Sequence, residues 1–361
     1  MRIESLSNAT VRDVAAAAGV SLRTVCRVLN GSEDALRAET RTRVLAAAEK
    51  LRYVPNASAK AVRRGHSGGI ALLLSSDLQR SYLPEALLDG IQEKLRAHDL
   101  HMTVAAVPDP QLTDEAVVPK FLRQWMADGL LVNYTIRIPP ALVSRIERLR
   151  IPAVWINIRR KTDCVYIDDF HAARRLTEYL WRLGHRRIAY VDYHNDLSAP
   201  QDWHYSAVDR CRGYEQAMAT AGLTARVLRQ DGQLPVRRKI EAAVMLLKAP
   251  DRPTAIITYS PGRTTLPIHL AAVAHCGLRV PEDLSLTTFS PFAEDDVGVA
   301  MTKMLLPERE MGREAVAMLL RKIGRRGAQP SRCLAATLVE GESTAPPPRE
   351  RSKGRGERVD G

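Results

Sequence analysis

The chain has 361 residues, of which 45% are hydrophobic and 26% charged, and its formal net charge is +12. No apolar run approaches the roughly twenty residues of a membrane span, and the opening stretch MRIESLSNATVRD lacks the apolar core of a signal peptide. These features argue against a membrane protein and a secreted one, so we expect a globular cytoplasmic protein of two or three domains.

The positive charge is concentrated near the N-terminus. Residues 1–66 carry twelve Lys or Arg against six Asp or Glu, which places half of the net charge in under a fifth of the chain. A basic segment of this size is the electrostatic footprint of a small nucleic-acid-binding domain.

Residues 11–18 and 22–29 predict two short helices joined by a turn. Thr10 and Ser21 are expected to cap them, and Gly19 readily takes the positive φ that ends the first. The second helix would expose side chains that can reach base edges in a major groove: Leu22, Arg23, Cys26 and Arg27. This pattern predicts a helix-turn-helix domain at 1–55, and the alternative is a plain helical hairpin.

A third helix at 40–51 is expected to close the small core through Val44, Leu45, Ala48 and Leu51. After Pro55, residues 57–64 have room for two helical turns, too few to be stable alone in water. We therefore predict a hinge at 56–66 that becomes helical on DNA, and the alternative is a flexible basic linker.

Three stretches resemble the lactose-repressor family of bacterial transcription regulators: TVRDVAAAAGVSLRTVCRVLNG, TRTRVLAAAEKLRYVPNASAKAVRRG and LGHRRIAYV. The resemblance runs from about residue 9 to 340. It implies that Leu22, Arg23 and Arg27 face bases, and that the residues near phosphates are Ser21, Thr24, Asn30, Tyr53 and Asn56. It also implies DNA contacts by the hinge residues Ala59, Lys60, Val62 and Arg63.

Two residues depart from that family's pattern. Val62 stands where the family has a leucine that wedges into the minor groove at the operator centre, so a shallower kink is expected. Arg37 stands where the family usually has a serine that caps the third helix, so some local stability is expected to be lost.

After residue 68 short apolar runs alternate with amphipathic stretches. The predicted strands are 69–75, 101–107, 129–133, 152–157, 187–192, 254–259 and 284–289. The predicted helices are 83–98, 170–183, 212–221, 236–248 and 308–322. This alternation predicts an α/β body with two parallel sheets and a ligand cleft between them, like that of a periplasmic binding protein.

We expect this body to span 67–340 in two lobes. The first lobe takes in about 67–160 and 291–320, and the second about 161–290 and 321–340. Residues 341–361 are rich in Pro, Gly and charge, which predicts a disordered tail. The tail has no heptad repeat, so we expect a homodimer instead of a tetramer. By resemblance, the helix after Pro307 lies at the dimer interface.

The enzyme alternative finds little support. The glycines of RRGHSGG precede the first strand instead of following it, and no Walker sequence or nucleophile elbow is present. His185 is more often structural at the entry to a buried strand, and neighbouring acids such as Asp168 and Asp169 point apart. The five cysteines are scattered without a zinc-type spacing, so we expect no metal and no cofactor.

The resemblance implies effector contacts at the ends of strands. Asp77 follows the first strand, Asn157 follows the fourth, and Arg210 stands at the arginine that grips effector hydroxyls or a carboxylate. Trp203 or Phe292 either stacks on a sugar face or belongs to the core. Ser290 stands where the family has an aspartate that commonly holds sugars, so we expect either an effector other than a typical sugar, such as an anion held by Arg210 and Arg263, or no effector.

These features together predict a repressor that binds pseudo-palindromic double-stranded DNA as a homodimer under the control of a small-molecule effector. Two alternatives stay open. One is a DNA-binding dimer whose body no longer senses a ligand, and the other is an enzyme with an attached DNA-binding domain.

Overall fold

The structure is a computed structural model, and it divides the chain into two compact units, which we call the head (Met1–Gly68) and the body (Gly69–Gly361). The structure describes residues 9–29, 37–53, 66–76, 80–108, 127–259, 265–292, 298–325 and 327–348. Within these ranges no helix is long and apolar enough to cross a membrane.

The head contains three helices in its described part: α1 (Val11–Ala18), α2 (Leu22–Leu29) and α3 (Ala38–Lys50). Thr10 caps α1 in a reciprocal arrangement, because its Oγ1 accepts from the backbone N–H of Asp13 and its own N–H donates to the Asp13 carboxylate. Gly19 ends α1 at φ +62°, and the Ser21 Oγ accepts from the N–H of Thr24 to begin α2. The predicted helix-turn-helix is confirmed.

The head's core differs from the prediction at one residue. Val14, Val25 and Val44 are fully buried between the three helices, as the apolar spacing predicts. Leu45 was expected in the core, but its side chain is 46% exposed because the α3 face that packs on α1 and α2 passes through Val44, Ala47 and Ala48. Arg37 makes no side-chain capping bond to α3, as expected from the missing serine.

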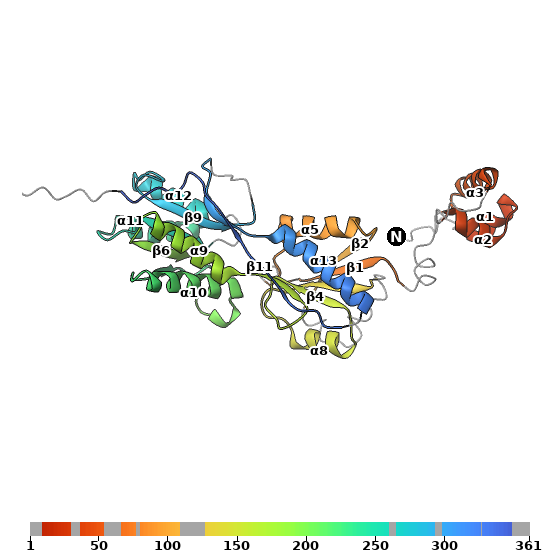
Figure 1. Cartoon of the computed structure of the whole chain (residues 1–361), viewed down its shortest axis with the longest axis horizontal. Coiled ribbons are helices and arrows are strands. Elements are labelled where there is room, and N and C mark those ends of the chain that lie inside the picture. Colours follow the sequence, from red (N-terminus) through yellow and green to blue (C-terminus); the bar gives the residue numbers. More distant parts are fainter. Residues whose placement is uncertain are drawn as a thin grey trace, which may run out of the picture. The chain divides into compact units, whose positions relative to one another are not determined.

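The body has two lobes, each built on its own sheet (Figure 1). The first lobe's sheet has the order β11-β5-β4-β3-β1-β2, and all its pairs are parallel. Its strands are β1 (Gly69–Ser75), β2 (His101–Val107), β3 (Gly129–Asn133), β4 (Ala153–Ile156), β5 (Cys164–Ile167) and β11 (Arg332–Leu334).

The second lobe's sheet has the order β12-β10-β9-β8-β6-β7, parallel except for the antiparallel edge pair of β10 and β12. Its strands are β6 (Ile188–Asp192), β7 (Arg226–Arg229), β8 (Ala255–Tyr259), β9 (Ser285–Ser290), β10 (Thr302–Leu305) and β12 (Thr337–Val339). The two parallel sheets of the predicted fold class are thus confirmed.

Helices cover both faces of each sheet. In the first lobe α5 (Glu85–Arg96) and α13 (Glu308–Arg325) pack on one face, and α8 (Pro140–Arg148) packs on the other. In the second lobe the helices are α9 (Asp169–Arg182), α10 (Tyr205–Thr220), α11 (Val236–Lys248) and α12 (Thr265–His275). Because both faces are covered, strands such as β1 are buried along nearly their whole length.

The helices α5 and α13 approach each other closely at two glycines. A Cβ atom on Gly90 would overlap the carbonyl oxygen of Arg309, and one on Gly312 would overlap that of Leu87. This contact holds α13 in the first lobe, and it therefore fixes the position at which α13 begins.

The predicted lobe boundaries are wrong in three places. β5 lies in the first lobe instead of the second, and β10 lies in the second instead of the first. The segment expected to belong wholly to the second lobe also divides, because β11 joins the first sheet and β12 the second. The chain therefore passes between the lobes after β5, between β10 and α13, and between β11 and β12.

Part of the predicted disordered tail is ordered. Ser343 is fully buried, and its carbonyl oxygen accepts from the N–H of Leu286 in β9. The carbonyl of Ala345 accepts from Nε2 of His185, whose Nδ1 lies 2.8 Å from the Thr254 hydroxyl. Residues 341–348 thus extend the second lobe because they have hydrogen-bonding partners on its sheet, and residues 349–361 lie outside the described part.

Candidate functional site

The head presents the predicted DNA-reading residues on one surface of α2. Leu22 is 44% exposed, Arg23 is exposed and Arg27 is half-buried, while Val25 and Val28 on the opposite side are in the core. Ser21, Thr24 and Tyr53 are exposed or half-buried. The other DNA-contact predictions lie outside the described residues: Asn30, Asn56, Ala59, Lys60, Val62 and Arg63.

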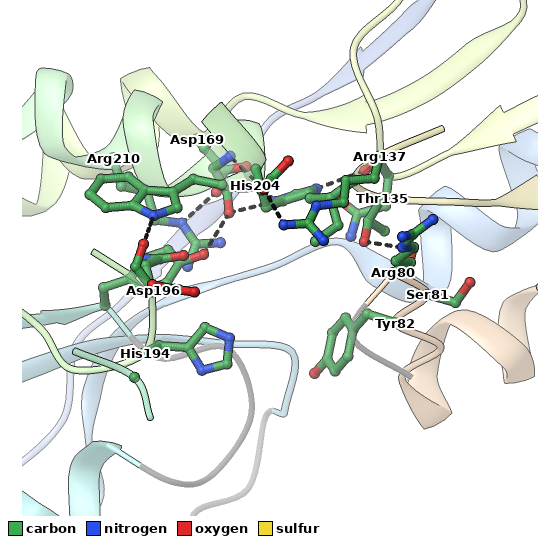
Figure 2. Close-up of a pocket in the computed structure, with 18 of the residues that line it drawn as sticks. Arg80, Ser81, Tyr82, Thr135, Arg137, Asp169, His194, Asp196, His204 and Arg210 are labelled. Carbon is green, nitrogen blue, oxygen red and sulfur yellow. Dashed lines mark hydrogen bonds and ion pairs between the residues drawn. The ribbon is translucent and has the colours of Figure 1, made fainter. Parts of the chain in front are cut away.

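The body contains a cavity of about 570 Å³ between the two lobes (Figure 2). The first lobe lines it with residues 80–82 after β1, 135–137 after β3 and Asn157 after β4. The second lobe contributes residues 194–196 after β6, Tyr259 at the end of β8 and others. The lining thus gathers at the carboxyl ends of parallel strands, where α/β folds bind ligands.

A buried ion pair lies in the wall of this cavity. Nε of Arg210 in α10 donates to Oδ1 of Asp169 in α9 at 2.6 Å, and the side chains are only 5% and 1% exposed. The guanidinium carbon lies 4.2 Å from the Phe289 ring centroid and 5.3 Å from that of Tyr259. Burial by itself lowers the pKa of Arg210, but the charge and hydrogen bond of Asp169 together with Tyr259 and Tyr190 raise it by more, so the pKa is raised overall.

Glu308 adds a second buried acid to the lining. It is the first residue of α13 and is 3% exposed, and its Oε2 has no hydrogen-bond partner among the described residues. Burial raises the pKa of Glu308 to about 8, Arg210 opposes this, and Asp169 adds to it. An unpaired carboxyl in such a place is therefore largely neutral at pH 7.

Polar contacts join the two lobes around the cavity. Arg137, which follows β3, forms an ion pair with Asp202 of the second lobe (Figure 2), and Arg159 pairs with Asp209 of α10 at 2.7 Å. His204 Nε2 donates to the carbonyl oxygen of Asn157 at 2.8 Å. These contacts stabilise the arrangement of the lobes that the structure shows.

Histidines and aromatic side chains complete the lining. Tyr82 and His194 point into the cavity from opposite lobes (Figure 2), and burial lowers the pKa of His194 and of His204. Within the described ranges no group of three or more His, Cys, Asp or Glu is placed to hold a metal ion.

Both the head and the body match families of known proteins. The model of the bacterial regulatory proteins of the lacI family matches residues 10–56, and that of the periplasmic binding protein-like domain matches residues 177–344. Residues 10–56 thus match the lacI family of bacterial regulators. The lacI-family match covers the three helices α1, α2 and α3 of the head. The other match covers most of the second lobe and includes α13.

Relatives match over nearly the whole chain. The transcriptional repressor PurR of Erwinia tasmaniensis is 28% identical over 94% of this chain and 98% of its own length. The transcriptional regulator DegA of Bacillus subtilis is 27% identical over 93% of this chain and 98% of its own length.

Solved structures of the lacI family show the same fold. The lac repressor dimer bound to operator and the anti-inducer ONPF is 23% identical, with a TM-score of 0.76 over 94% of this chain and 100% of that one. The complex of the transcriptional regulator CelR with cellobiose is 27% identical, with a TM-score of 0.59 over 93% and 100%.

The structure brings three of the five predicted effector residues together. Asn157, Trp203 and Arg210 line the cavity, and the Trp203 indole N–H donates to the carbonyl oxygen of Asp196 at 2.6 Å. Ser290 is not part of this lining, and its Oγ accepts from the N–H of Phe292, which lies outside the lining as well. Asp77 lies outside the described residues.

Sequence reasoning missed several lining residues. Asp169 was considered only as part of an adjacent acidic pair, and Glu308 only as the start of a predicted helix. Tyr82, His194 and His204 carried no motif. A signal for Glu308 was present, because an acid directly after Pro307 begins a helix that follows an apolar strand, but that pattern is also ordinary at an exposed helix N-terminus.

Proposed function

We propose that the protein is a cytoplasmic repressor that binds a pseudo-palindromic operator as a homodimer and senses a small molecule in the cavity of the body. The observation that carries this proposal is the α2 surface, where Leu22 and Arg23 are exposed within the segment that matches the lacI-family model. The relatives named above are transcriptional regulators, which favours regulation over catalysis.

In this proposal Arg23 and Arg27 read guanines, and Leu22 contacts a base. Arginine suits this role because its fork donates to two acceptors of guanine in the major groove. Ser21, Thr24 and Tyr53 bind phosphates, which orient the head without reading sequence. Asn30, Asn56 and the hinge residues Ala59, Lys60, Val62 and Arg63 complete the proposed DNA surface.

Binding-site selection from random duplexes tests the DNA function. The wild type is expected to select one palindromic consensus, and Arg23→Ala is expected to lose preference at one symmetric pair of positions. Arg43→Ala, which removes the same charge from an exposed position of α3, serves as the control and should keep the consensus. Equal affinity of the wild type for selected and random duplexes would reject a sequence-specific regulator.

The effector is proposed to act through the angle between the lobes. The ion pairs of Arg137 with Asp202 and Arg159 with Asp209 bridge the lobes, so a ligand between them changes which arrangement is favoured. The predicted hinge at 56–66 would carry this change to the head. By linkage, DNA and effector alter each other's affinity by the same factor, typically about 5- to 150-fold.

Footprinting on the DNA flanking the protein's own gene, with and without a pool of metabolites, tests this control. A footprint that changes with the pool supports effector sensing. A footprint that never changes, together with a melting temperature that no metabolite shifts, would favour a body that serves dimerisation alone.

A further inference from the structure

The chain segments before and after Glu308 hold this residue at the cavity. Its N–H donates to the carbonyl oxygen of Leu306 at 2.9 Å, directly after β10 of the second lobe. The helix that it begins packs against α5 of the first lobe through Gly90 and Gly312. Glu308 therefore stands at a crossing between the lobes, and its side chain is buried there.

The carboxyl group of Glu308 has unused hydrogen-bonding capacity. No described residue donates to either of its oxygens, although the side chain is 3% exposed and lines the cavity. Arg210 has unused hydrogen-bond donors. Its Nε donates to Asp169, but no described residue accepts from its two Nη atoms. Arginine can only donate, whereas a carboxyl group offers acceptors in either protonation state.

We propose that Glu308 determines the specificity of the effector site, and that the effector presents an amine or amidine nitrogen to Glu308 and an oxygen acceptor to the Nη atoms of Arg210. This inference rests on the proposed function of the cavity as the effector site. It replaces the expectation of an anion, whose other support, Arg263, lies outside the described residues.

Among the acids of the lining, Glu308 is the one that a ligand donor can reach. Three arginines face four carboxyl groups: Arg80, Arg137 and Arg210 against Asp169, Asp196, Asp202 and Glu308. Arg210 is neutralised by Asp169, and Arg137 pairs with Asp202. Asp196 accepts hydrogen bonds from the N–H and Oγ of Ser198, whereas Oε2 of Glu308 accepts none from a described residue. A buried carboxylate is stable only when a donor, best a charged one, reaches it.

The groups around Glu308 make its ionisation depend on the ligand. Burial raises the pKa of Glu308, Arg210 lowers it and Asp169 raises it further. Burial also raises the pKa of Tyr82 to about 12, so this phenol stays neutral. His194 and His204 have lowered pKa values and stay neutral above pH 6.5. An amine that binds would therefore displace a proton from Glu308, so its affinity rises with pH up to about 8.

Capture of small molecules by the full-length protein tests the assignment. Wild type, Glu308→Gln and the control Glu310→Gln, which changes an exposed acid in the same helical turn, are each incubated with the small-molecule fraction of a cell extract. Retained compounds are identified by mass spectrometry. We expect an amine- or amidine-bearing compound on wild type and Glu310→Gln, and at least about tenfold less on Glu308→Gln.

The dependence of affinity on pH provides the second readout. Between pH 6.5 and 7.5 the dissociation constant of the captured compound is expected to fall about tenfold for wild type and to stay constant for Glu308→Gln. Capture of a carboxylate or phosphate without such a nitrogen, equal capture by Glu308→Gln, or a flat pH profile overturns this inference and leaves effector sensing intact. Capture of nothing by a DNA-binding wild type overturns effector sensing and this inference with it.

Discussion

The head and the body hold their functional charges in opposite ways. Arg23 is exposed on α2, over a core whose buried side chains, among the described residues of the head, are apolar ones such as Val14 and Val25. Arg210 and Asp169 are 5% and 1% exposed in the wall of the body's cavity. An exposed arginine costs little to hold and acts by reaching a polyanion, whereas a buried charge is tolerated only with its partner.

This contrast separates binding from stability in the head and couples them in the body. Changes to the reading surface should alter DNA affinity while the fold keeps its free energy of unfolding. Changes to the cavity should alter the free energy of unfolding as well as ligand affinity, because removing one member of a buried ion pair leaves its partner's charge buried without compensation.

The largest effect is expected for Arg210→Ala. The change leaves the Asp169 carboxylate buried without its cation, which destabilises a protein by about 3–5 kcal/mol. Urea unfolding of the body measures it. The double variant with Asp169→Asn should recover part of the loss, and an unfolding free energy unchanged by Arg210→Ala would contradict the buried ion pair.

Glu308→Gln is expected to stabilise the body at high pH. Burial raises the pKa of Glu308 in the native protein to about 8 from its ordinary value of 4.5, so native protein keeps a proton that unfolded protein has lost. This destabilising contribution is absent below about pH 4.5 and grows as pH rises to 8, where removing it should add on the order of 3 kcal/mol.

The control for this prediction is again the exposed Glu310→Gln. Melting temperatures of wild type, Glu308→Gln and Glu310→Gln are compared at pH 5 and pH 8. Only Glu308→Gln should gain stability between the two pH values relative to wild type, and an equal gain in Glu310→Gln would point to net charge as the cause.

Arg23→Ala is expected to weaken binding to the selected operator by about 1–3 kcal/mol without changing the unfolding free energy by more than about 0.5 kcal/mol. The reason is that the side chain is exposed and lies outside the core of the head. Fluorescence anisotropy and urea unfolding measure the two quantities. A loss of stability as large as the loss of affinity would remove the contrast between head and body.

Gly19→Ala is expected to destabilise the head by about 1 kcal/mol. Gly19 has φ +62°, a conformation that costs an alanine about 1–2 kcal/mol, while its added Cβ would meet no atom within 4 Å. Hydrogen exchange in α1 of the full chain reports this local loss. Protection of the body's strands should stay the same, since Gly19 belongs to the other unit.

Arg137→Ala is expected to have the smallest effect on stability, less than about 1 kcal/mol. Its ion pair with Asp202 bridges the lobes, but the side chains are 48% and 22% exposed, so solvent screens the attraction. Urea unfolding of Arg137→Ala and of Arg210→Ala compares the loss of unfolding free energy on removing an exposed ion pair with that on removing a buried one. Equal losses in the two variants would show that burial is not what distinguishes them.

Local patterns predicted much of the fold. Thr10, Gly19 and Ser21 mark the ends of α1 and α2 because capping and positive φ depend on a few neighbouring residues. The strands at 69–75, 101–107 and 129–133 were predicted at their observed bounds. Those at 69–75 and 129–133 are buried parallel strands, which are continuous apolar runs.

Short or weakly patterned elements were missed. The strands β5, β7, β11 and β12 have only three or four residues, and β7 carries arginines at both ends. The helices α8 and α12 were also missed. In such segments the neighbouring strand or helix decides the conformation, and local propensity contributes little.

The amino-acid sequence by itself determined the helix-turn-helix, the exposed Arg23 and the alternation of strands and helices, because each depends on residues within a few positions of one another. Tertiary structure alone decided where the chain crosses between lobes, which residues pair in the cavity, and that Glu308 is buried there. Asp169 and Arg210 are 41 residues apart, and Arg137 and Asp202 are 65 apart. Such contacts form only when separate strands and helices have packed, since no local spacing brings those side chains together.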